Sequence, residues 1–356
     1  MSIDTLDEAR LKQILRIFPD LRLAILGDFF LDAYYDCDPA LDEKSLETGK
    51  NCYQVIRLRR QAGAAGTVAA NLVALGVGAV EAIGFCGDDG EGYELRRAMD
   101  GLGLDQTGFF LCPERFTPTY GKPCYVDGRA PGKPVVEELE RLDTKNRRQT
   151  PVPLQERILD HALARLDAWD GLILVDQANE PNCGVLTSRV RRRLAEELHR
   201  RPDGVFLADS RERIDQFRHV MIKPNQFEAA QVLGRPARRP SLKSSTADAD
   251  QLVRRTGRPV FLTLGEKGML VADGNAVERT SGVPVGGPID PVGAGDSTSA
   301  AIVASLAAGA SLVEAATIAN LVASITVQQI GTTGIARPTQ VLRRFRETQG
   351  SRADTD

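Results

Sequence analysis

The sequence contains no segment that would cross a membrane or direct secretion. Nowhere do 18 uncharged apolar residues run together, so no transmembrane helix is expected. The N-terminal stretch MSIDTLDEARLKQILRIF is charged throughout, has helical spacing and lacks an apolar signal segment. We therefore expect a soluble cytoplasmic protein with reduced thiols and no membrane partner.

The usual ligands of zinc and the usual redox cysteines are also scarce. The chain has three histidines, none of them near a cysteine, and its six cysteines form no CxxC or CxxxC pair. This spacing argues against a zinc site and against a redox dithiol. The residues concerned are His161, His199, His219, Cys37, Cys52, Cys86, Cys112, Cys124 and Cys183.

A large excess of charge of either sign is missing as well. The formal net charge of the 356 residues is −3, which gives no electrostatic reason to expect a nucleic-acid partner. We interpret the basic runs RVRRRLAEELHRR and RPARRP as solvated faces of a helix and a loop.

Two common phosphate-binding motifs do not occur. The Gly-Ala-Gly stretch at 293–295 has Thr298 where a dinucleotide-binding GxGxxG motif needs its third glycine, and it lies late in the chain rather than in the first strand-to-helix turn. No GxxxxGK(S/T) motif is found either. These absences exclude a dinucleotide-dependent oxidoreductase and a P-loop protein.

Short apolar runs that alternate with helical patterns are abundant. This rhythm predicts an α/β fold with a mostly parallel central sheet flanked by helices, and functional sites in such sheets lie at the carboxyl ends of the strands. We expect strands at 21–28, 79–87, 170–176, 204–209, 220–225 and 259–265. We expect helices at 67–76, 90–102, 153–168, 184–200 and 226–233.

Two stretches break this rhythm. Residues 36–60 and 116–142 are typical of short strands and turns, and we interpret them as one small β lid built from two insertions. We therefore expect a single domain over residues 1–345 and a frayed tail over 346–356.

The stretch IDPVGAGDSTSAAI, residues 289–302, predicts an anion site at the start of a helix. Gly293, Ala294 and Gly295 let a ligand approach the backbone N–H groups, and a helix N-terminus favours negative charge. The alternative is a glycine-rich turn in which Asp296 only caps the helix.

Combined with other stretches, this motif resembles the ribokinase-like carbohydrate kinases, the PfkB family. The family signature Asp-Thr-x-Gly-Ala-Gly-Asp stands here at 290–296 with proline in place of threonine, and its Asn-x-x-Glu element stands within KPNQFEA. The stretches AGAAGTVAANLVALG, TLGEKG and IANLVASITVQQIGT follow in the order of the family, so the resemblance covers about residues 21–345.

Several segments are still more similar to heptose 7-phosphate kinase domains, among them GDFFLDAYY, PTYGK and VFLADSRERIDQFRHVMIKPNQFEA. This resemblance favours a heptose 7-phosphate-like acceptor. No HxGH motif of an adenylyltransferase occurs, so we expect a stand-alone kinase.

The resemblance implies a phosphoryl-transfer centre around Asp296. This aspartate would act as the general base on the attacking sugar hydroxyl, and we expect the helix N-terminus to lower its pKa. The N–H groups of Gly293, Ala294 and Gly295 would form the anion hole for the transferring phosphoryl group.

ATP and Mg²⁺ are the implied cofactors, and a monovalent cation is left open. Asn225 and Glu228 would position Mg²⁺, although the same pair also fits a helix capping box. Residues that resemble the nucleotide site of the family are Asn225, Thr263, Gly265, Lys267, Gly268 and Asn320. Thr263, Gly265 and Gly268 resemble its phosphate loop, with Lys267 as a phosphate contact, and the alternative is a plain turn that ends a strand. Asn320 is either near the adenine or a structural asparagine.

On the sugar side, carboxylates accept hydrogen bonds from hydroxyl groups, so Asp28 and Asp32 are candidate ligands, as is Asp176. The family pattern Gly-Gly-x-x-Asn reads here as Gly63, Ala64 and, in place of the asparagine, Thr67. Asn179 and Glu180 stand where heptose kinases carry lysine and glycine. Candidate partners for a phosphate on the substrate are Lys122, Arg129 and Arg141.

The sequence thus predicts an ATP-dependent sugar kinase, with a homodimer through the lid implied by the resemblance and by exposed lid edges. Two alternatives remain. One is a fructose-type or nucleoside kinase of the same fold, and the other is a non-catalytic sugar-phosphate-binding protein. An intact base and metal pair count against the second, because binding alone needs neither.

Overall fold

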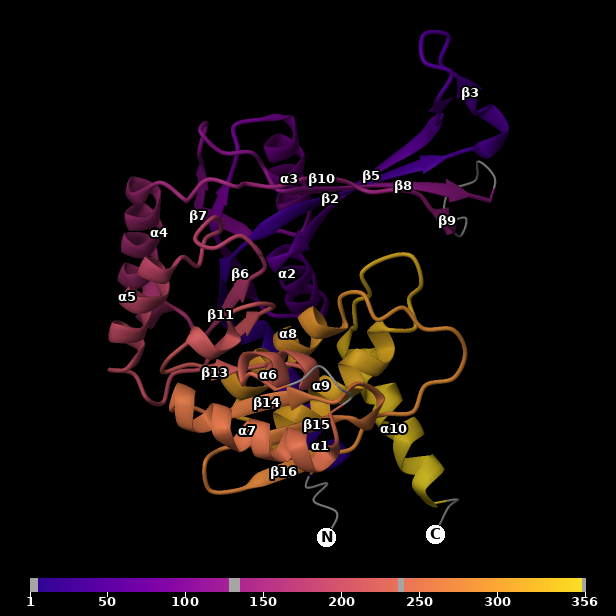
Figure 1. The fold of residues 1–356 in the computed structure, drawn as a ribbon. Helices are drawn as coiled ribbons and strands as arrows, with labels where there is room; N and C mark the ends of the chain where they lie inside the picture. Colours follow the sequence, from indigo (N-terminus) through magenta and orange to yellow (C-terminus); the bar gives the residue numbers. More distant parts are fainter. Residues whose placement is uncertain (1–5, 128–134, 236–239, 354–356) are drawn as a thin grey trace.

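A nine-stranded sheet forms the centre of the molecule (Figure 1). The computed structural model describes residues 6–127, 135–235 and 240–353, so Arg129 lies outside the described residues. Neighbouring strands are parallel from β7 to β14, and β15 and β16 add an antiparallel edge. The strand order is β16 (Val277–Thr280), β15 (Met269–Ala272), β14 (Val260–Thr263), β13 (Met221–Ile222), β12 (Phe206–Ser210), β11 (Gly171–Asp176), β1 (Arg22–Gly27), β6 (Ala79–Cys86) and β7 (Asp105–Leu111).

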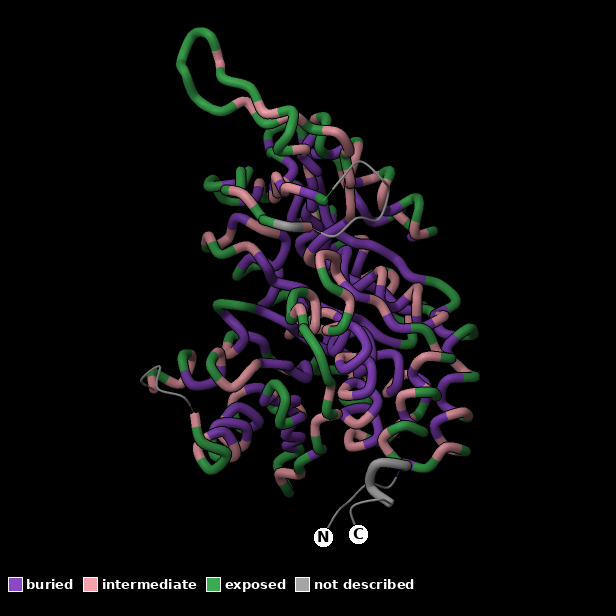
Figure 2. The backbone as a smooth tube through the Cα atoms, turned by 90° about the vertical axis from the view of Figure 1, so that its right-hand side faces the viewer, coloured by how far each residue is buried: buried purple, intermediate pink, exposed green. Residues whose placement is uncertain are grey.

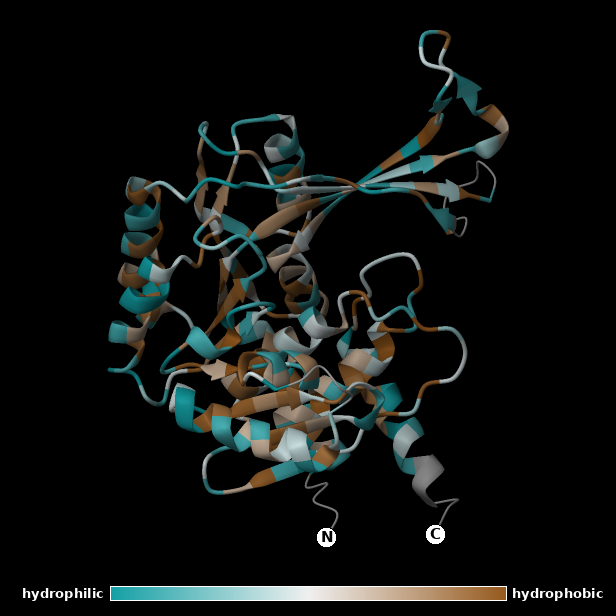
Figure 3. Ribbon diagram, viewed as in Figure 1, coloured by the Kyte–Doolittle hydropathy of each residue, from teal (hydrophilic) through white to brown (hydrophobic). Residues whose placement is uncertain are grey.

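Helices cover both faces of this sheet because its strands are apolar on both sides. In β1, Leu23 and Ile25 pack into one core cluster, whereas Ala24 and Leu26 pack into the other. Figure 3 shows the strands as hydrophobic and the outer faces of the helices as hydrophilic. The first cluster includes residues of α1 (Glu8–Ile17), α2 (Ala65–Ala74), α3 (Gly90–Gly101), α8 (Ala294–Ala307), α9 (Leu312–Thr326) and α10 (Pro338–Ala353), and the second those of α4 (Val152–Arg165), α5 (Ser188–Leu198), α6 (Gln226–Val232) and α7 (Leu242–Thr256).

A second, smaller sheet projects from the body and is called the lid here. Its strand order is β10-β8-β2-β5, with β9 paired to β8, and a short β3–β4 hairpin carries the exposed loop at the top of Figure 2. The lid strands are β2 (Phe29–Cys37), β3 (Glu43–Lys44), β4 (Asn51–Cys52), β5 (Val55–Ala64), β8 (Thr119–Val126), β9 (Val135–Glu138) and β10 (Leu142–Thr144).

The lid begins earlier than the sequence analysis predicts. Strand β2 starts at Phe29, only one residue after β1 ends, whereas the predicted insertion starts at residue 36. The cause is that most of β2 is buried and extended, so its apolar half cannot be separated from the preceding core strand by composition. The lid strand is therefore a direct continuation of the central sheet.

Part of the predicted tail, residues 346–353, belongs to a helix. Helix α10 runs from Pro338 to Ala353, because Phe345 is buried in the core and Arg346 forms an ion pair with Glu8 at 2.7 Å. Among the described residues, no helix combines the length and the apolar character needed to cross a membrane.

Candidate functional site

The turn before α8 presents free backbone donors at the carboxyl edge of the sheet. Gly293 has a positive φ of 79°, which glycine adopts without strain, and it caps the helix. Among the described residues, the N–H groups of Gly293, Gly295 and Asp296 have no partner. The N–H of Ala294 donates to Pro291 O at 3.1 Å, so Ala294 is not a free donor as predicted. Three N–H groups of this turn are thus available to an anion.

The turn is fixed from several sides. Asp290 accepts from Val292 N at 3.0 Å and from Gly331 N at 3.2 Å, which holds the turn against the segment that follows α9. A Cβ atom at Gly293 would lie 3.4 Å from Thr67 Cγ2. The predicted sugar-side residue Thr67 therefore packs directly against Gly293.

Asp296 lies in the first turn of α8 and is half-buried. Burial, and next the negative charge of Asp209, raise the pKa of Asp296 from 3.8 to about 7, while Lys223 and Arg211 lower it. The predicted lowering by the helix N-terminus is wrong, because the cost of burying the charge exceeds the helix effect. A carboxyl group with this pKa can accept a proton near neutral pH.

The sequence analysis did not identify Lys223, which precedes Asn225 in KPNQFEA. The ammonium group of Lys223 is buried and pairs with Asp209 Oδ2 at 3.0 Å, and Ser299 Oγ donates to the same oxygen at 2.8 Å. A Cβ atom at Gly295 would lie 3.5 Å from Lys223 Nζ. The ammonium group therefore lies next to Gly295. A lysine next to the Asn-x-x-Glu element was the available signal.

Asn225 and Glu228 form the full capping box of α6. Asn225 Oδ1 accepts from Phe227 N and Glu228 N at 2.8 and 2.9 Å, and Glu228 Oε2 accepts from Asn225 N at 2.8 Å. Burial raises the pKa of Glu228, and the charge of Lys223 opposes that rise. The helix capping box, which was the alternative to a metal site, is thus formed. It still leaves Glu228 Oε1 without a hydrogen bond among the described residues.

This donor set fits a hydrated Mg²⁺ better than an enclosed metal. No group of three or more metal-binding side chains occurs in the described part of the chain. Mg²⁺ commonly keeps several waters and takes one or two carboxylates together with substrate phosphates. Glu228 Oε1 could supply such a contact, whereas the amide oxygen of Asn225 is already used by the helix cap.

The predicted nucleotide loop lies beside this cap. Thr263 at the end of β14 forms an isolated bridge with Asn225. Gly265 and Gly268 adopt positive φ values of 64° and 91°, and a Cβ atom at Gly268 would lie 2.1 Å from Thr280 O. Lys267 is exposed and its ammonium group has no partner among the described residues. The loop thus offers an accessible cation on a turn that only glycines can form.

Asn320 is held by the structure itself. Its Nδ2 donates to Thr280 Oγ1 at 2.9 Å and to Ser281 O at 3.1 Å, which ties α9 to the end of β16. The structural alternative accounts for the amide nitrogen of Asn320 and leaves only its oxygen for a ligand.

The lid strand β2 carries a carboxylate, that of Asp32, whose charge acts on Asp296. Asp32 on β2 pairs with Lys122 Nζ at 2.9 Å, and Lys122 also donates to Tyr34 OH at 3.2 Å. A Cβ atom at Gly63 would lie 2.7 Å from Asp32 Oδ2, so this position must be glycine for Asp32 to keep its place. Lys122, predicted as a partner for a substrate phosphate, is instead the partner of Asp32.

Ala64 carries backbone strain at the junction between β5 and α2. Its φ of 53° and ψ of −116° lie in a region that residues other than glycine rarely adopt. This is the position at which the family pattern has its second glycine.

Asp28 and Asp176 are occupied by other groups of the protein. Asp28 accepts from the N–H groups of Gln177, Ala178 and Val185 at 2.7–2.9 Å, and burial raises its pKa to about 6. Asp176 receives two hydrogen bonds from Arg213, at 2.7 and 3.1 Å, and one from Ser210 Oγ at 2.6 Å. Both predicted sugar ligands therefore position the loop after β11 rather than offer free oxygens.

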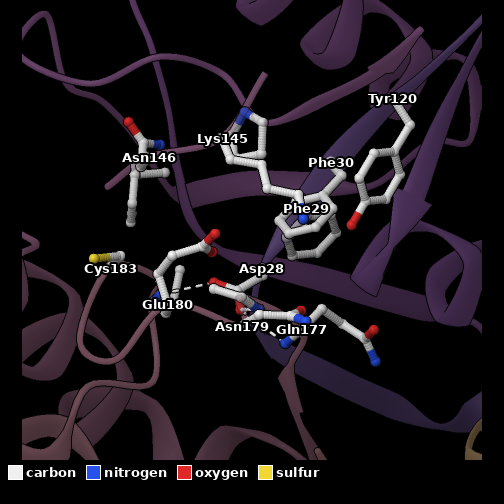
Figure 4. Close-up of a pocket in the computed structure, with 15 residues that line it drawn as sticks. Asp28, Phe29, Phe30, Tyr120, Lys145, Asn146, Gln177, Asn179, Glu180 and Cys183 are labelled. Carbon is white, nitrogen blue, oxygen red and sulfur yellow. Dashed lines mark hydrogen bonds between the residues drawn. The ribbon is translucent and has the colours of Figure 1, made fainter. Parts of the chain in front are cut away.

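A pocket lies between this loop and the lid (Figure 4). Figure 4 shows Asp28, Gln177, Asn179 and Glu180 along one side, and Phe30, Tyr120 and Lys145 along the other. Arg141 does not line it, because its guanidinium stacks on the ring of Tyr120 and pairs with Asp143.

Comparison with known proteins places this geometry in context. The model of the family described as pfkB family carbohydrate kinase matches residues 183–340. The chain is 27% identical over 338 residues to bifunctional protein HldE of Pelobacter propionicus, covering 93% of this chain and 65% of that protein. HldE of Caulobacter vibrioides is 30% identical over 331 residues, covering 92% and 64%. The chain thus spans less than two thirds of the length of these relatives.

Solved structures confirm the fold. The ribokinase of Arabidopsis thaliana, complexed with ribose and ATP, superposes with a TM-score of 0.66 at 17% identity over 91% of this chain and 98% of that chain. The phosphofructokinase-2 of Escherichia coli, in complex with fructose-6-phosphate, gives a TM-score of 0.68 at 16% identity over 92% and 99%. The predicted ribokinase-like α/β fold and the resemblance to PfkB carbohydrate kinases are therefore confirmed.

Proposed function

We propose that this chain, a carbohydrate kinase of the PfkB type, transfers the γ-phosphate of ATP to a hydroxyl group of a sugar or sugar phosphate. The observation that carries the proposal is the position of Asp296. It is a carboxyl group with a pKa of about 7 in a helix N-terminal turn with three free N–H groups, one of them its own.

In the proposed reaction, the sugar oxygen attacks the γ-phosphorus and the bond between the γ-phosphorus and the β,γ-bridging oxygen breaks, so that ADP leaves. Asp296 accepts the hydroxyl proton as the new oxygen–phosphorus bond forms. The N–H groups of Gly293, Gly295 and Asp296 hydrogen-bond the phosphoryl oxygens as their charge spreads. Lys223, whose ammonium group lies next to Gly295, adds a positive charge to the turn.

Glu228 would hold a hydrated Mg²⁺ through its free carboxylate oxygen, and the ion would neutralise part of the phosphate charge when bound. The loop with Thr263, Gly265 and Lys267 would lie along the phosphates of ATP, with the Lys267 ammonium as a mobile contact. A contribution from a monovalent cation has no support from the geometry described above.

Asp32 is the proposed hydrogen-bond acceptor for the sugar hydroxyls, because its second carboxylate oxygen is not used by Lys122. The resemblance to heptose 7-phosphate kinases favours a heptose-type acceptor. A fructose-type or nucleoside acceptor is the second candidate, favoured by Ala64 and Thr67, which depart from the Gly-Gly-x-x-Asn pattern.

Two further parts of the proposal concern the setting of the enzyme. The six cysteines are free thiols, which suits the reducing cytoplasm where ATP is available. The edge strand β5 exposes Val55 and Leu58, and pairing of this edge with a second copy would produce a homodimer through the lid.

The test is ADP release from MgATP over a panel of heptose 7-phosphates, hexose phosphates, free ketoses, pentoses and nucleosides. We expect one class of compound to drive turnover by the wild type, and Asp296→Asn to reduce kcat by about 10²–10⁴-fold with little change in the KM for ATP. Binding of sugars without ADP release in the wild type would overturn the kinase proposal in favour of a sugar-binding protein.

A further inference from the structure

The pocket of Figure 4 contains two opposite charges that are not paired with each other. Lys145 enters from the segment between β10 and α4, and Glu180 enters from the loop after β11. Within the described residues, neither side chain forms an ion pair or a hydrogen bond. Each therefore keeps its full hydrogen-bonding capacity for a ligand.

The remaining lining of the pocket is aromatic and neutral. Phe30 and Tyr120 meet edge to face with ring centroids 5.4 Å apart. Among the described residues the hydroxyl group of Tyr120 has no partner. An aromatic surface with hydroxyl, amide and charged groups around it matches the carbon–hydrogen face and the hydroxyl groups of a sugar.

The balance of charge does not suit a phosphate in this pocket. Asp28 and Glu180 bring two carboxyl groups, and Lys145 brings one ammonium group. A phosphate group carries about −1.5 to −2 charges near pH 7. Among the lining side chains the two carboxyl groups outweigh the single lysine, while Arg211 and Arg141 act on Tyr120 from outside the lining.

The pocket connects to the reacting centre through the lid. Phe30 and Asp32 lie two residues apart on β2 and so share one face, and Tyr120 on β8 is in register with Asp32. The charge of Asp32 acts on both Tyr120 and Asp296. A sugar bound at Asp32 can therefore face Asp296 with one end and reach the pocket with the other.

We infer that the pocket between Glu180, Lys145 and Tyr120 selects an acceptor sugar whose far end is an unphosphorylated hydroxyl group. Glu180 accepts a hydrogen bond from that hydroxyl, and Lys145 and Tyr120 donate to its oxygen atoms. This inference rests on the proposed kinase function and narrows its acceptor class. It selects free sugars over the 7-phosphate form that the family resemblance favours.

The experiment compares matched pairs of free and phosphorylated heptose, fructose and ribose in the ADP-release assay. For the pair that turns over, we expect the wild type to favour the free sugar by at least about 10-fold in kcat/KM. Glu180→Lys should reduce this preference by about 10-fold or more, because it lowers the KM of the phosphorylated sugar. The preference of Glu180→Gln should lie between those of the wild type and Glu180→Lys. Glu180 is half-buried and unpaired, so both variants are expected to fold.

The control is Glu212→Lys, which makes the same charge change at an exposed residue after β12 that does not line the pocket. Its preference should stay within about twofold of the wild type. The inference would be overturned if the wild type prefers the phosphorylated sugar, or if Glu180→Lys leaves the preference unchanged. Either result would leave the kinase proposal intact.

If no compound is turned over, the kinase proposal fails by itself. Calorimetric titration of the wild type and Glu180→Lys with the same pairs then tests the pocket. Preferential binding of the free sugar that is lost in the variant supports the inference, and equal or tighter binding of the phosphorylated sugar by the wild type overturns it.

Discussion

The pKa of Asp296 makes the pH dependence of the proposed kinase reaction a sensitive test of the site. With a pKa of about 7, the carboxylate form is about one tenth of the total at pH 6, about half at pH 7 and about nine tenths at pH 8. Because the base must be ionised to accept the hydroxyl proton, kcat/KM should rise about tenfold per pH unit on the acid side and level off above pH 8.

Asp209 and Lys223 form the ion pair next to Asp296. Removing either charge should shift the acid limb, which is the rising part of the pH profile of kcat/KM, and the two shifts should be opposite in direction. Asp209 raises the pKa of Asp296 and Lys223 lowers it. Asp209→Asn should therefore shift the limb to lower pH, and Lys223→Met should shift it to higher pH. Each shift should amount to about one pH unit for a single charge near a half-buried carboxyl group.

The assay is initial-rate ADP release at low sugar concentration between pH 5 and 9, with the limb position fitted separately from the plateau. Lys223→Met should also lower the plateau, because the variant removes a positive charge next to Gly295. The control is Asp250→Asn, which breaks a surface ion pair with Arg254 on α7. A limb near pH 4, or a shift in the same direction in both variants, would refute the assignment of Asp296 as a base tuned by this pair.

Two further predictions concern Gly63 and Ala64, at the end of the lid strand β5. Ala64→Gly should raise the free energy of unfolding by about 1 kcal/mol in urea denaturation, because relief of strain at positive φ exceeds the added entropy of the unfolded chain. The control Ala69→Gly, inside α2, should lower the free energy of unfolding by about as much. Equal losses of stability in both variants would contradict the proposed strain at Ala64. Gly63→Ala should raise the sugar KM by about 10-fold with an unchanged KM for ATP, because the new Cβ displaces the Asp32 carboxylate. Gly101→Ala, which meets no atom within 4 Å, is its control, and a normal sugar KM in Gly63→Ala would show that Asp32 does not hold the sugar.

The regular part of the fold could be predicted from the sequence because its strands are continuous apolar runs. The run LILVD lies within β11, and the spacing of the helix at 153–168 matches α4 to within a few residues. Boundaries set by tertiary contacts could not be predicted. Phe345 and Arg346 extend α10 because they meet the core and Glu8, and local composition carries no trace of either contact.

Within the site, the residues on the glycine turn could be predicted because backbone geometry restricts them to small side chains. The state of the carboxyl groups could not. Asp28 and Asp32 look alike in the sequence, yet three backbone N–H groups occupy Asp28, while Asp32 forms an ion pair on the lid. Burial of Asp296 likewise depends on packing between distant segments, so the sign of its pKa shift was predicted wrongly.

Because a single residue connects the central sheet to the lid, movement of the lid is coupled to the groups that this residue contacts. Asp28 joins β1 to β2, its N–H bonds to Val175 O, its carbonyl accepts from Ala65 N, and its carboxylate holds the loop after β11. A tilt of β2 about Asp28 would therefore displace the start of α2 and the loop that carries Glu180. A sugar that draws the lid inward would reshape its own binding pocket in the same movement.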